Sequence, residues 1–292
     1  MTASADVEQR FARARPRLLR LAYSELGDFA AAEDVVQDAW VRLERAGPET
    51  IRDLDAWLTT VVGRLALDAL RSARARREAY VGPWLPDPLV ASADGDPADR
   101  VTLDEAVSYA LLALLEQLSP AERTAFVLHD IFDVPFDEVA DVVGRSTAAV
   151  RKLAARARRH VAAQRPRFAV SSEAHQRAVC AFARATSEGN LDALLEVLDP
   201  EVVFTADGGG RVPAARRPLR GAARVGAVWI KLTRRARDGG TVDLVRVNGE
   251  AGVLVRFPRG DRSLLAFAVD GGRIVRIDVL RNPEKLRRAL EP

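Results

Sequence analysis

The spacing of hydrophobic residues changes near position 170, and this change limits the fold of the 292-residue chain more than any other feature. Over residues 5–77 and 103–161, apolar side chains recur every three or four positions, which is the period of one buried helix face. From residue 200 onward, short apolar runs alternate with turn sequences such as Asn248-Gly249, which is typical of strands joined by hairpins. We therefore predict a multidomain chain in which two all-α domains precede an α+β domain with a curved sheet. The predicted strands are 202–206, 241–247, 251–257, 263–269 and 273–280.

Capping and turn residues divide the helical part into segments. Gly27 ends the first predicted helix, and Asp28 is placed to cap a second helix that stops before Gly47-Pro48. Residues 80–100 contain four prolines and two glycines, so we expect an unstructured linker there. Helical spacing then returns, and Ser119-Pro120 fits a cap followed by proline in the first turn.

Composition favours a folded protein of the cytoplasm. Of the residues, 48% are hydrophobic, and charges of both signs are mixed, unlike in a disordered chain. The N-terminus has no basic patch followed by an apolar run, and no window of eighteen uninterrupted apolar residues occurs. We therefore expect neither a signal peptide nor a membrane span. The single Cys180 has no partner for an internal disulfide, which suits a reducing compartment.

Positive charge is clustered in two places. Residues 145–167 contain eight Arg or Lys and no Asp or Glu, and residues 71–77 contain four Arg and no acid. The segment between them, 87–105, is acidic. A GC-rich genome explains why Arg outnumbers Lys, but it does not explain this clustering. Two basic segments flanking an acidic linker indicate two contact points for a polyanion.

Residues 136–161 have the pattern of a helix-turn-helix. A short amphipathic helix is followed by Gly144, which tolerates a left-handed turn, and by Ser146, which can cap the next helix. Val150 and Leu153 lie on the face of the second helix that would be buried, and basic residues lie on its other face. Such a helix fits the major groove of DNA. The alternative is a solvated basic face on an ordinary helical hairpin.

The same segment resembles region 4 of extracytoplasmic-function sigma factors. The family pattern L-x-x-L-x-x-x-x-R-x-x-F precedes the helix-turn-helix and corresponds here to Leu115, Leu118, Arg123 and Phe126. The resemblance implies that the motif reads the −35 promoter element. The residues expected at that element are Arg145, Ser146, Thr147, Arg151, Lys152 and Arg156.

The N-terminal helices resemble region 2 of the same family. Residues 32–43 are similar to the helix that docks on core RNA polymerase, and residues 55–77 to the helix and loop that read and melt the −10 element. The resemblance implies polymerase docking by Asp34, Gln37 and Asp38. The residues expected at the −10 element are Arg64, Asp68, Arg71, Arg74, Arg76 and Arg77, although Asp68 also fits a structural ion pair with a neighbouring Arg.

The C-terminal domain resembles the SnoaL-like cone fold, and three short motifs resemble marks of the sigma subgroup that carries such an extension. One motif lies in the linker, one in a loop of the cone and one near the C-terminus, where Glu284 replaces the usual Asp. The resemblance implies contact among the three and regulation of the sigma factor by its own extension. Each motif could also be a simple turn, linker or helix start. The residues are Trp84, Leu85, Pro86, Asp207, Gly208, Gly209, Gly210, Asn282, Pro283, Glu284, Lys285 and Leu286.

Catalysis is not expected. Enzymes with this fold place an acid–base pair in the cone, yet no Tyr follows Tyr109 and no His follows His175. Asp243 and Asp278 remain, and pairing with Arg accounts for both. We expect no cofactor and no metal, since His129 and the other histidines lack metal-ligand spacing. A cavity that binds a small ligand is an open alternative.

The predicted domains are region 2 (1–78), the linker (79–103), region 4 (104–166) and the SnoaL-like domain (170–292). We predict a sigma factor that binds core RNA polymerase and promoter DNA, is not an enzyme, and is regulated by its own C-terminal domain. Two alternatives are a DNA-binding sensor that recruits no polymerase and an enzyme fused to a DNA-binding half. The docking resemblance disfavours the first, and the missing acid–base residues disfavour the second.

Overall fold

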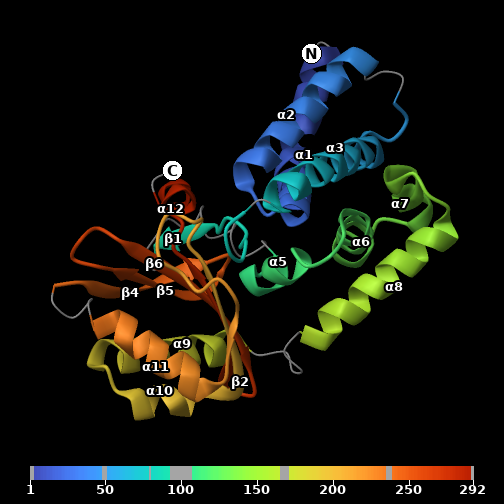
Figure 1. The fold of residues 1–292 in the computed structure, drawn as a ribbon. Helices are drawn as coiled ribbons and strands as arrows, with labels where there is room; N and C mark the ends of the chain where they lie inside the picture. Colours follow the sequence, from blue (N-terminus) through green and yellow to red (C-terminus); the bar gives the residue numbers. More distant parts are fainter. Residues whose placement is uncertain are drawn as a thin grey trace. The chain divides into compact units, whose positions relative to one another are not determined.

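The computed structural model describes residues 3–47, 51–78, 80–92, 107–164, 171–234 and 239–290. It divides into two compact units, drawn in Figure 1. The first unit comprises Met1–Glu78 and Leu114–Gln164, and the second comprises Ala79–Ala113 and Arg165–Pro292. The second unit therefore contains the linker as well as the C-terminal domain.

Three helices form the N-terminal part of the first unit: α1 (Ala3–Leu26), α2 (Phe29–Ala46) and α3 (Leu54–Glu78). Asp28 caps α2 by accepting a hydrogen bond of 3.1 Å from the Ala31 amide, as its position predicts. Gly27 has a φ of 63° and so turns the chain between α1 and α2. Leu21, Leu43 and Leu58 pack in the shared interior and are fully buried.

The remaining helices of the first unit are α6 (Pro120–Phe126), a π-helical turn η2 (Val127–Ile131), α7 (Phe136–Val143) and α8 (Thr147–Gln164). Ser119 and Glu122 form a capping box at the start of α6. Gly144 takes the predicted left-handed conformation between α7 and α8, with a φ of 69°. Helix α3 packs against α6 and α7, and Gly63 leaves room there for Val142. The predicted all-α fold of this part is confirmed.

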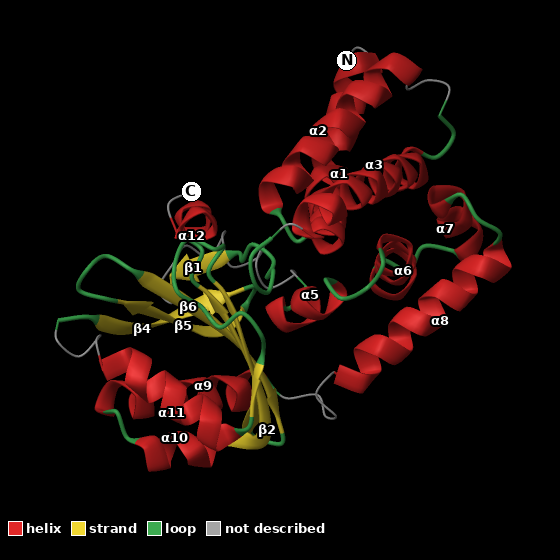
Figure 2. Ribbon diagram, viewed as in Figure 1, coloured by secondary structure: helices red, strands yellow, loops and turns green. Residues whose placement is uncertain are grey.

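The second unit is built on one seven-stranded sheet in the order β1-β4-β5-β6-β7-β2-β3. Neighbouring strands are antiparallel except β2 and β7, which are parallel. Helices α9, α10 and α11 cover one face, as Figure 2 shows. The elements are α5 (Tyr109–Leu115), α9 (Ser172–Glu188), α10 (Leu191–Val197), α11 (Ala222–Thr233), α12 (Pro283–Leu290), β1 (Val90–Ser92), β2 (Leu198–Asp207), β3 (Leu219–Arg220), β4 (Thr241–Val247), β5 (Glu250–Arg256), β6 (Arg262–Asp270) and β7 (Arg273–Leu280).

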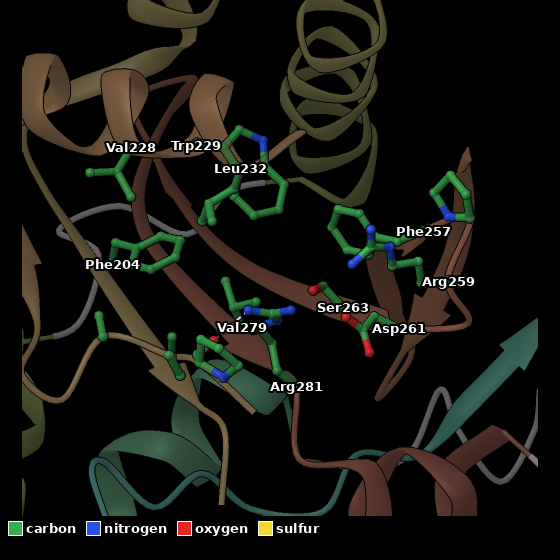
Figure 3. Close-up of a pocket in the computed structure, with 15 residues that line it drawn as sticks. Phe204, Val228, Trp229, Leu232, Phe257, Arg259, Asp261, Ser263, Val279 and Arg281 are labelled. Atoms are coloured by element: carbon green, nitrogen blue, oxygen red, sulfur yellow. Dashed lines mark hydrogen bonds between the residues drawn. The ribbon is translucent and has the colours of Figure 1, made fainter. Parts of the chain in front are cut away.

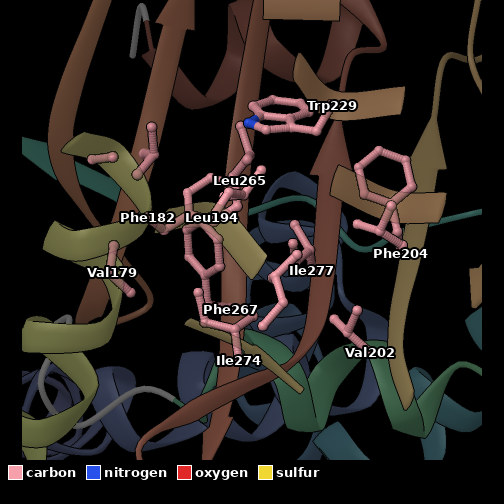
Figure 4. Packing of buried hydrophobic residues seen from close by; sticks show 14 of the residues in the cluster. Val179, Phe182, Leu194, Val202, Phe204, Trp229, Leu265, Phe267, Ile274 and Ile277 are labelled. Carbon is pink, nitrogen blue, oxygen red and sulfur yellow. The ribbon is translucent and has the colours of Figure 1, made fainter. Parts of the chain in front are cut away.

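The main core of the second unit lies between the sheet and these three helices. Phe182 of α9 packs edge to face on Phe267 of β6, with ring centroids 4.9 Å apart, and also contacts Trp229 of α11. Figure 4 shows these rings among the aliphatic residues of β6 and β7. The predicted strands are all present, which confirms the α+β domain. Helix α11 was not predicted.

The opposite face of the sheet is also buried. Leu264 and Ala266 of β6 point to this face, where Leu85 of the linker, Tyr109 of α5 and Leu286 of α12 cover them. Strand β6 is thus buried on both faces, which explains its continuous apolar sequence.

This packing corrects the expectation of an unstructured linker and adds a finding on the start of the region 4 segment. Residues 80–92 are not an unstructured linker, because they lie on the sheet and β1 pairs with β4 at its edge. Tyr109 and Ala113, which lie in the segment assigned to region 4, pack with the cone. The physical reason is the same in both cases, since an apolar sheet face must be covered. Residues 93–106 lie outside the described part of the chain.

Candidate nucleic-acid interface and linker clamp

Helix α8 has one exposed basic face, and its opposite face is buried against neighbouring helices. Val150, Ala154 and Ala157 face α6 and α7 and have no exposed surface. The Ser146 hydroxyl accepts a hydrogen bond of 3.3 Å from the Ala149 amide, so this side chain caps the helix. Thr147 is half-buried. The exposed residues of the predicted −35 set are Arg145, Ser146, Arg151, Lys152 and Arg156.

Some basic side chains of α8 already contact other residues of the protein. Arg151 lies over the ring of Phe136, with 5.4 Å between its guanidinium carbon and the ring centroid. Arg158 pairs with Asp130 at 2.5 Å and so has a structural role. Arg151 keeps its exposed position at the start of the helix, where a recognition helix contacts bases.

The predicted region 2 residues are exposed on α2 and α3. Asp34, Gln37 and Asp38 lie together on the outer face of α2. Arg64 is exposed, but its guanidinium donates a hydrogen bond of 3.1 Å to the backbone oxygen of Asp141 on α7. Asp68 and Arg71 form an ion pair of 3.2 Å on the surface of α3. The side chains of Arg74, Arg76 and Arg77 lie outside the described residues.

A buried polar contact joins α1 to α6, and no sequence pattern predicts it. Arg123 is 2% exposed, donates to the Ser24 backbone oxygen at 3.2 Å and pairs with Glu116 at 2.7 Å. The Thr124 hydroxyl donates to the Glu25 carboxyl group at 3.0 Å. Burial raises the pKa of Glu25 to about 8, although the nearby Arg123 charge and the Thr124 hydrogen bond act to lower it. Arg123 thus belongs to the region 4 motif and also to the buried contact between α1 and α6.

In the second unit, Asp207 and Lys285 hold the linker to the cone. The Lys285 ammonium lies 3.0 Å from Asp207 Oδ2, and both side chains are buried. Lys285 also donates to the Leu85 backbone oxygen, and the Leu85 amide donates to Asp207 at 3.1 Å. The Tyr80 hydroxyl donates to Asp207 Oδ1 at 2.5 Å and accepts from Asn282 at 2.9 Å. We call Tyr80, Leu85, Asp207, Asn282 and Lys285 the linker clamp.

Aromatic rings and a second acid complete the clamp. The Lys285 ammonium sits 3.3 Å from the centroid of the Trp84 ring, and Trp84 packs on Tyr80. Asp87, also buried, lies 3.7 Å from Lys285 and 3.1 Å from Arg288. Burying a lysine ammonium group costs free energy unless nearby groups compensate for its lost hydration. Two carboxylates and a ring face compensate here, so the position of the ammonium depends on all of these partners.

The glycine triplet after Asp207 is a steric requirement of the clamp. A Cβ atom on Gly208 would come within 2.4 Å of the Val212 backbone oxygen. Gly209 has a φ of 64°, and a Cβ there would lie 2.5 Å from the Asn282 amide. The Gly209 amide also donates to Asp207 Oδ1 at 3.0 Å. The triplet therefore lets the Asn282 segment approach Asp207 closely.

Asn248 forms a second attachment for the linker. Its side-chain oxygen accepts from the Leu89 amide, and its side-chain nitrogen donates to the Val107 backbone oxygen, both at 3.0 Å. One amide side chain thus holds two linker segments that are 18 residues apart, since residue 107 minus residue 89 is 18. The Tyr109 hydroxyl donates to the Pro86 oxygen at 2.8 Å. The sequence pattern predicts Asn248 only as a turn residue and indicates no role for Tyr80.

The two candidate carboxylates of the cone are both paired with Arg. Asp278 lies 2.6 Å from Arg276, and Asp243 pairs with Arg256 on the neighbouring strand. No group of three or more His, Cys, Asp or Glu side chains in the described part of the chain could hold a metal ion. Among the described helices, none is both long enough and apolar enough to cross a membrane.

The two helical modules define a class of protein with one polymerase-docking part and one helix-turn-helix. Family models agree: residues 11–76 match Sigma-70 region 2, and residues 108–161 match Sigma-70, region 4. The chain is 42% identical to the ECF RNA polymerase sigma factor SigJ of Mycobacterium tuberculosis over 93% of its length and 90% of that protein. It is 40% identical to the probable ECF RNA polymerase sigma factor SigI of the same species, covering 93% and 92%.

The chain belongs to the extracytoplasmic-function sigma factors of RNA polymerase. The crystal structure of M. tuberculosis SigJ matches it with a TM-score of 0.79 and 36% identity, over 98% of this chain and all of that one. The match includes the C-terminal cone domain. The predicted family, fold and sigma-factor function are thus confirmed, with core RNA polymerase and promoter DNA as partners.

Proposed function

We propose that the cone domain regulates this sigma factor in cis by holding its linker. The observation that supports this is the linker clamp, in which Asp207 and Lys285 of the cone bind both the backbone and side chains of residues 80–85. The clamp acts on the chain that connects region 2 with region 4. Because clamp and linker belong to one polypeptide, a weak attachment works at high effective concentration.

The spacing of promoter elements makes the linker a sensible point of control. Elements centred near −35 and −10 are about 25 base pairs apart, or roughly 85 Å along straight DNA. Residues 79–113 could span this distance if extended, since each residue reaches about 3.4 Å. Attachment at Leu85 and at Asn248 takes up much of that reach, because Asn248 holds Leu89 and Val107 close together.

Contacts within the first unit support a closed resting form. Arg64, expected at the −10 element, instead binds the Asp141 backbone, and Arg123 bridges α1 and α6. Regions 2 and 4 packed in this way cannot reach two elements that lie so far apart. We propose that polymerase or DNA binding separates them, and that release of the linker permits the separation.

The individual contacts are part of this proposal. Region 4 reads the −35 element through Arg145, Ser146, Thr147, Arg151, Lys152 and Arg156. Region 2 reads the −10 element through Arg64, Asp68, Arg71, Arg74, Arg76 and Arg77, and docks on polymerase through Asp34, Gln37 and Asp38. Exposure of the described members other than the half-buried Thr147, together with the basic character of both DNA sets, supports this assignment.

We propose further that the cone has no catalytic role and that the protein works in the cytoplasm. Its candidate carboxylates Asp243 and Asp278 are engaged with Arg256 and Arg276, which leaves neither as a general base. The relatives over the full chain are sigma factors, and RNA polymerase acts on DNA inside the cell.

Transcription with purified core RNA polymerase and a promoter library tests the regulatory proposal. Tyr80→Phe removes a hydroxyl group from the linker and changes no residue of the cone. Lys285→Met removes the ammonium group on the cone side of the clamp. Both variants should initiate more transcripts than the parent chain. Arg256→Gln breaks an exposed ion pair of the same domain and serves as the matched control.

A distance measurement between dyes on α2 and α8 provides a second readout. Linker release should lengthen that distance in both clamp variants but not in Arg256→Gln. Equal initiation and equal distances in all four proteins would overturn regulation through the clamp, while leaving the sigma-factor activity itself intact.

A further inference from the structure

The cone encloses a cavity that no part of the sigma-factor activity uses. It has a volume of about 800 Å³ and is bounded by β2, α11, β7 and the turn between β5 and β6. This volume lies in the range of pockets that hold small organic molecules. Phe204, Val228, Trp229 and Leu232 form an apolar wall, visible in Figure 3. The Trp229 indole N–H is used by Thr186 at 3.0 Å, so Trp229 offers only its ring.

The opposite side of the cavity carries charge. Figure 3 shows Arg281 between the apolar wall and a polar group formed by Arg259, Asp261 and Ser263. Two arginines against one aspartate leave an excess of one positive charge at this end. Arg259 and Asp261 are exposed, whereas Arg281 is half-buried. Arg281 is therefore the cation best placed to meet a molecule inside the cavity.

Arg281 retains unused hydrogen-bonding capacity. Its Nη1 donates to the Pro213 backbone oxygen, and its guanidinium stacks 5.9 Å from the Phe257 ring centroid. Its Nε is buried and has no hydrogen-bond partner among the described residues. Burial lowers the pKa of the Arg281 guanidinium, while the Asp261 charge raises it, so an anionic partner would relieve a desolvated cation.

We infer that this cavity is a binding site for an apolar monocarboxylate, with the carboxylate on Arg281 and the hydrocarbon or aromatic body against Phe204, Trp229 and Leu232. A neutral apolar molecule would offer the Arg281 guanidinium no counter-ion. A dianion would exceed the positive charge that Arg281, Arg259 and Asp261 leave at this end of the cavity. The inference that follows for regulation rests on the function proposed above for the linker clamp.

The cavity and the linker clamp both include residues at or just beyond the ends of β2 and β7. Residues alternate across the β2–β7 pair, so Ala206 and Val279 face the cavity while Asp207 and Leu280 face the linker side. The Arg281 amide donates to the Asp207 backbone oxygen at 2.7 Å. A carboxylate that repositions Arg281 therefore acts on the backbone that carries Asp207 and precedes Asn282.

Titration calorimetry on the full chain tests the site. The probes are decanoate and indole-3-acetate, each compared with its neutral primary amide. The carboxylates should bind about ten- to hundredfold more tightly than the amides, as expected for hydrogen bonds to a charged group. Arg281→Gln should remove this preference and Arg281→Lys should keep part of it. Arg273→Gln, which changes an exposed arginine at the start of β7, the strand that precedes Arg281, should leave it unchanged.

The outcomes separate the site from its regulatory use. Absence of saturable binding by both carboxylates, equal affinity for acid and amide, or an unchanged preference in Arg281→Gln would each overturn the site. Binding that changes the tryptophan fluorescence of the parent chain by more than that of Trp84→Phe supports coupling to the clamp, because Trp229 lines the cavity in both proteins. Binding without that change supports the site and overturns the coupling. The clamp variants described above test the proposed function independently of any ligand.

Discussion

Replacement of Lys285 by methionine should destabilise the second unit strongly. Methionine keeps the length and apolar stem of lysine but removes the ammonium group that lies 3.0 Å from Asp207. Both side chains are almost completely buried, so the change leaves a carboxylate without its main counter-ion. Removing one member of a buried pair typically costs about 3–5 kcal/mol. Asp207 keeps hydrogen bonds from Tyr80, Leu85 and Gly209, so we expect about 3 kcal/mol, the lower end of that range.

Urea denaturation measures this cost if fluorescence reports on one unit only. Phe in place of Trp40 and Trp57 leaves Trp84 and Trp229, both in the second unit, as the remaining indoles. With a slope of about 2 kcal/mol per molar urea, the midpoint of Lys285→Met should fall by about 1.5 M. Arg256→Gln in the same background removes a half-exposed pair and should cost less than about 1 kcal/mol.

A double-mutant cycle shows whether the cost comes from the pair. Asp207→Asn combined with Lys285→Met removes both charges, so the double variant should be more stable than the sum of the two single losses predicts. If Lys285→Met unfolds at the same urea concentration as the parent, or if the two losses simply add, the ion pair does not hold the linker.

Three further predictions concern the helical unit, the glycine loop and DNA. The native first unit holds a proton on Glu25 up to pH about 8, whereas the unfolded chain loses it near 4.5, so stability should fall as pH rises between these values; Glu25→Gln should flatten that slope in pH-dependent denaturation. Gly209→Ala should lower the melting temperature more than Gly271→Ala, because both have positive φ but only Gly209 meets Asn282; equal losses would refute the steric argument. Arg151→Ala should weaken DNA binding by about 1–3 kcal/mol on the cognate −35 sequence alone, measured by fluorescence anisotropy, and an equal loss on all sequences would show a phosphate contact.

Local signals were sufficient for most of the secondary structure. Asp28 and Ser119 start helices because their side chains accept hydrogen bonds from backbone amides three residues ahead, and such bonds depend only on nearby sequence. Gly144 and Asn248 take positive φ for equally local reasons. Helix α11 was missed because Gly226 interrupts its pattern. That glycine serves a distant contact, since a Cβ there would lie 3.0 Å from Leu191.

The docked linker could not be predicted from its own composition. Three prolines and one glycine between residues 80 and 92 have the local signature of an irregular chain, and only a partner far along the sequence decides where it lies. Leu85 meets Leu264 across the outer face of the sheet. The uninterrupted apolar run 264–269 was the available signal, because a strand with one solvated face would alternate.

The candidate sites, too, could be predicted only in part from local sequence. The motifs around Asp207 and Asn282 could be found by resemblance, but their chemistry depends on Tyr80 and on a lysine 200 residues from the Leu85 oxygen that it binds. Arg64 was assigned to DNA from its charge and position. Its hydrogen bond to the Asp141 backbone depends on packing between α3 and α7, which no local pattern specifies.

Strand β1 has a consequence for the lifetime of the released state. Its three residues pair with β4 at the outer edge of the sheet, and Leu244 on β4 is already 41% exposed. Peeling β1 away would leave the outward-facing backbone groups of β4 at residues 245–247 without a strand partner, while β5 still pairs with the inner side of β4. Such an edge readily accepts a strand from another molecule, so a freed cone would be prone to self-association. By covering the edge of β4, the linker thus also limits self-association. A sigma factor whose linker stayed released for long would need another chain to cover that edge.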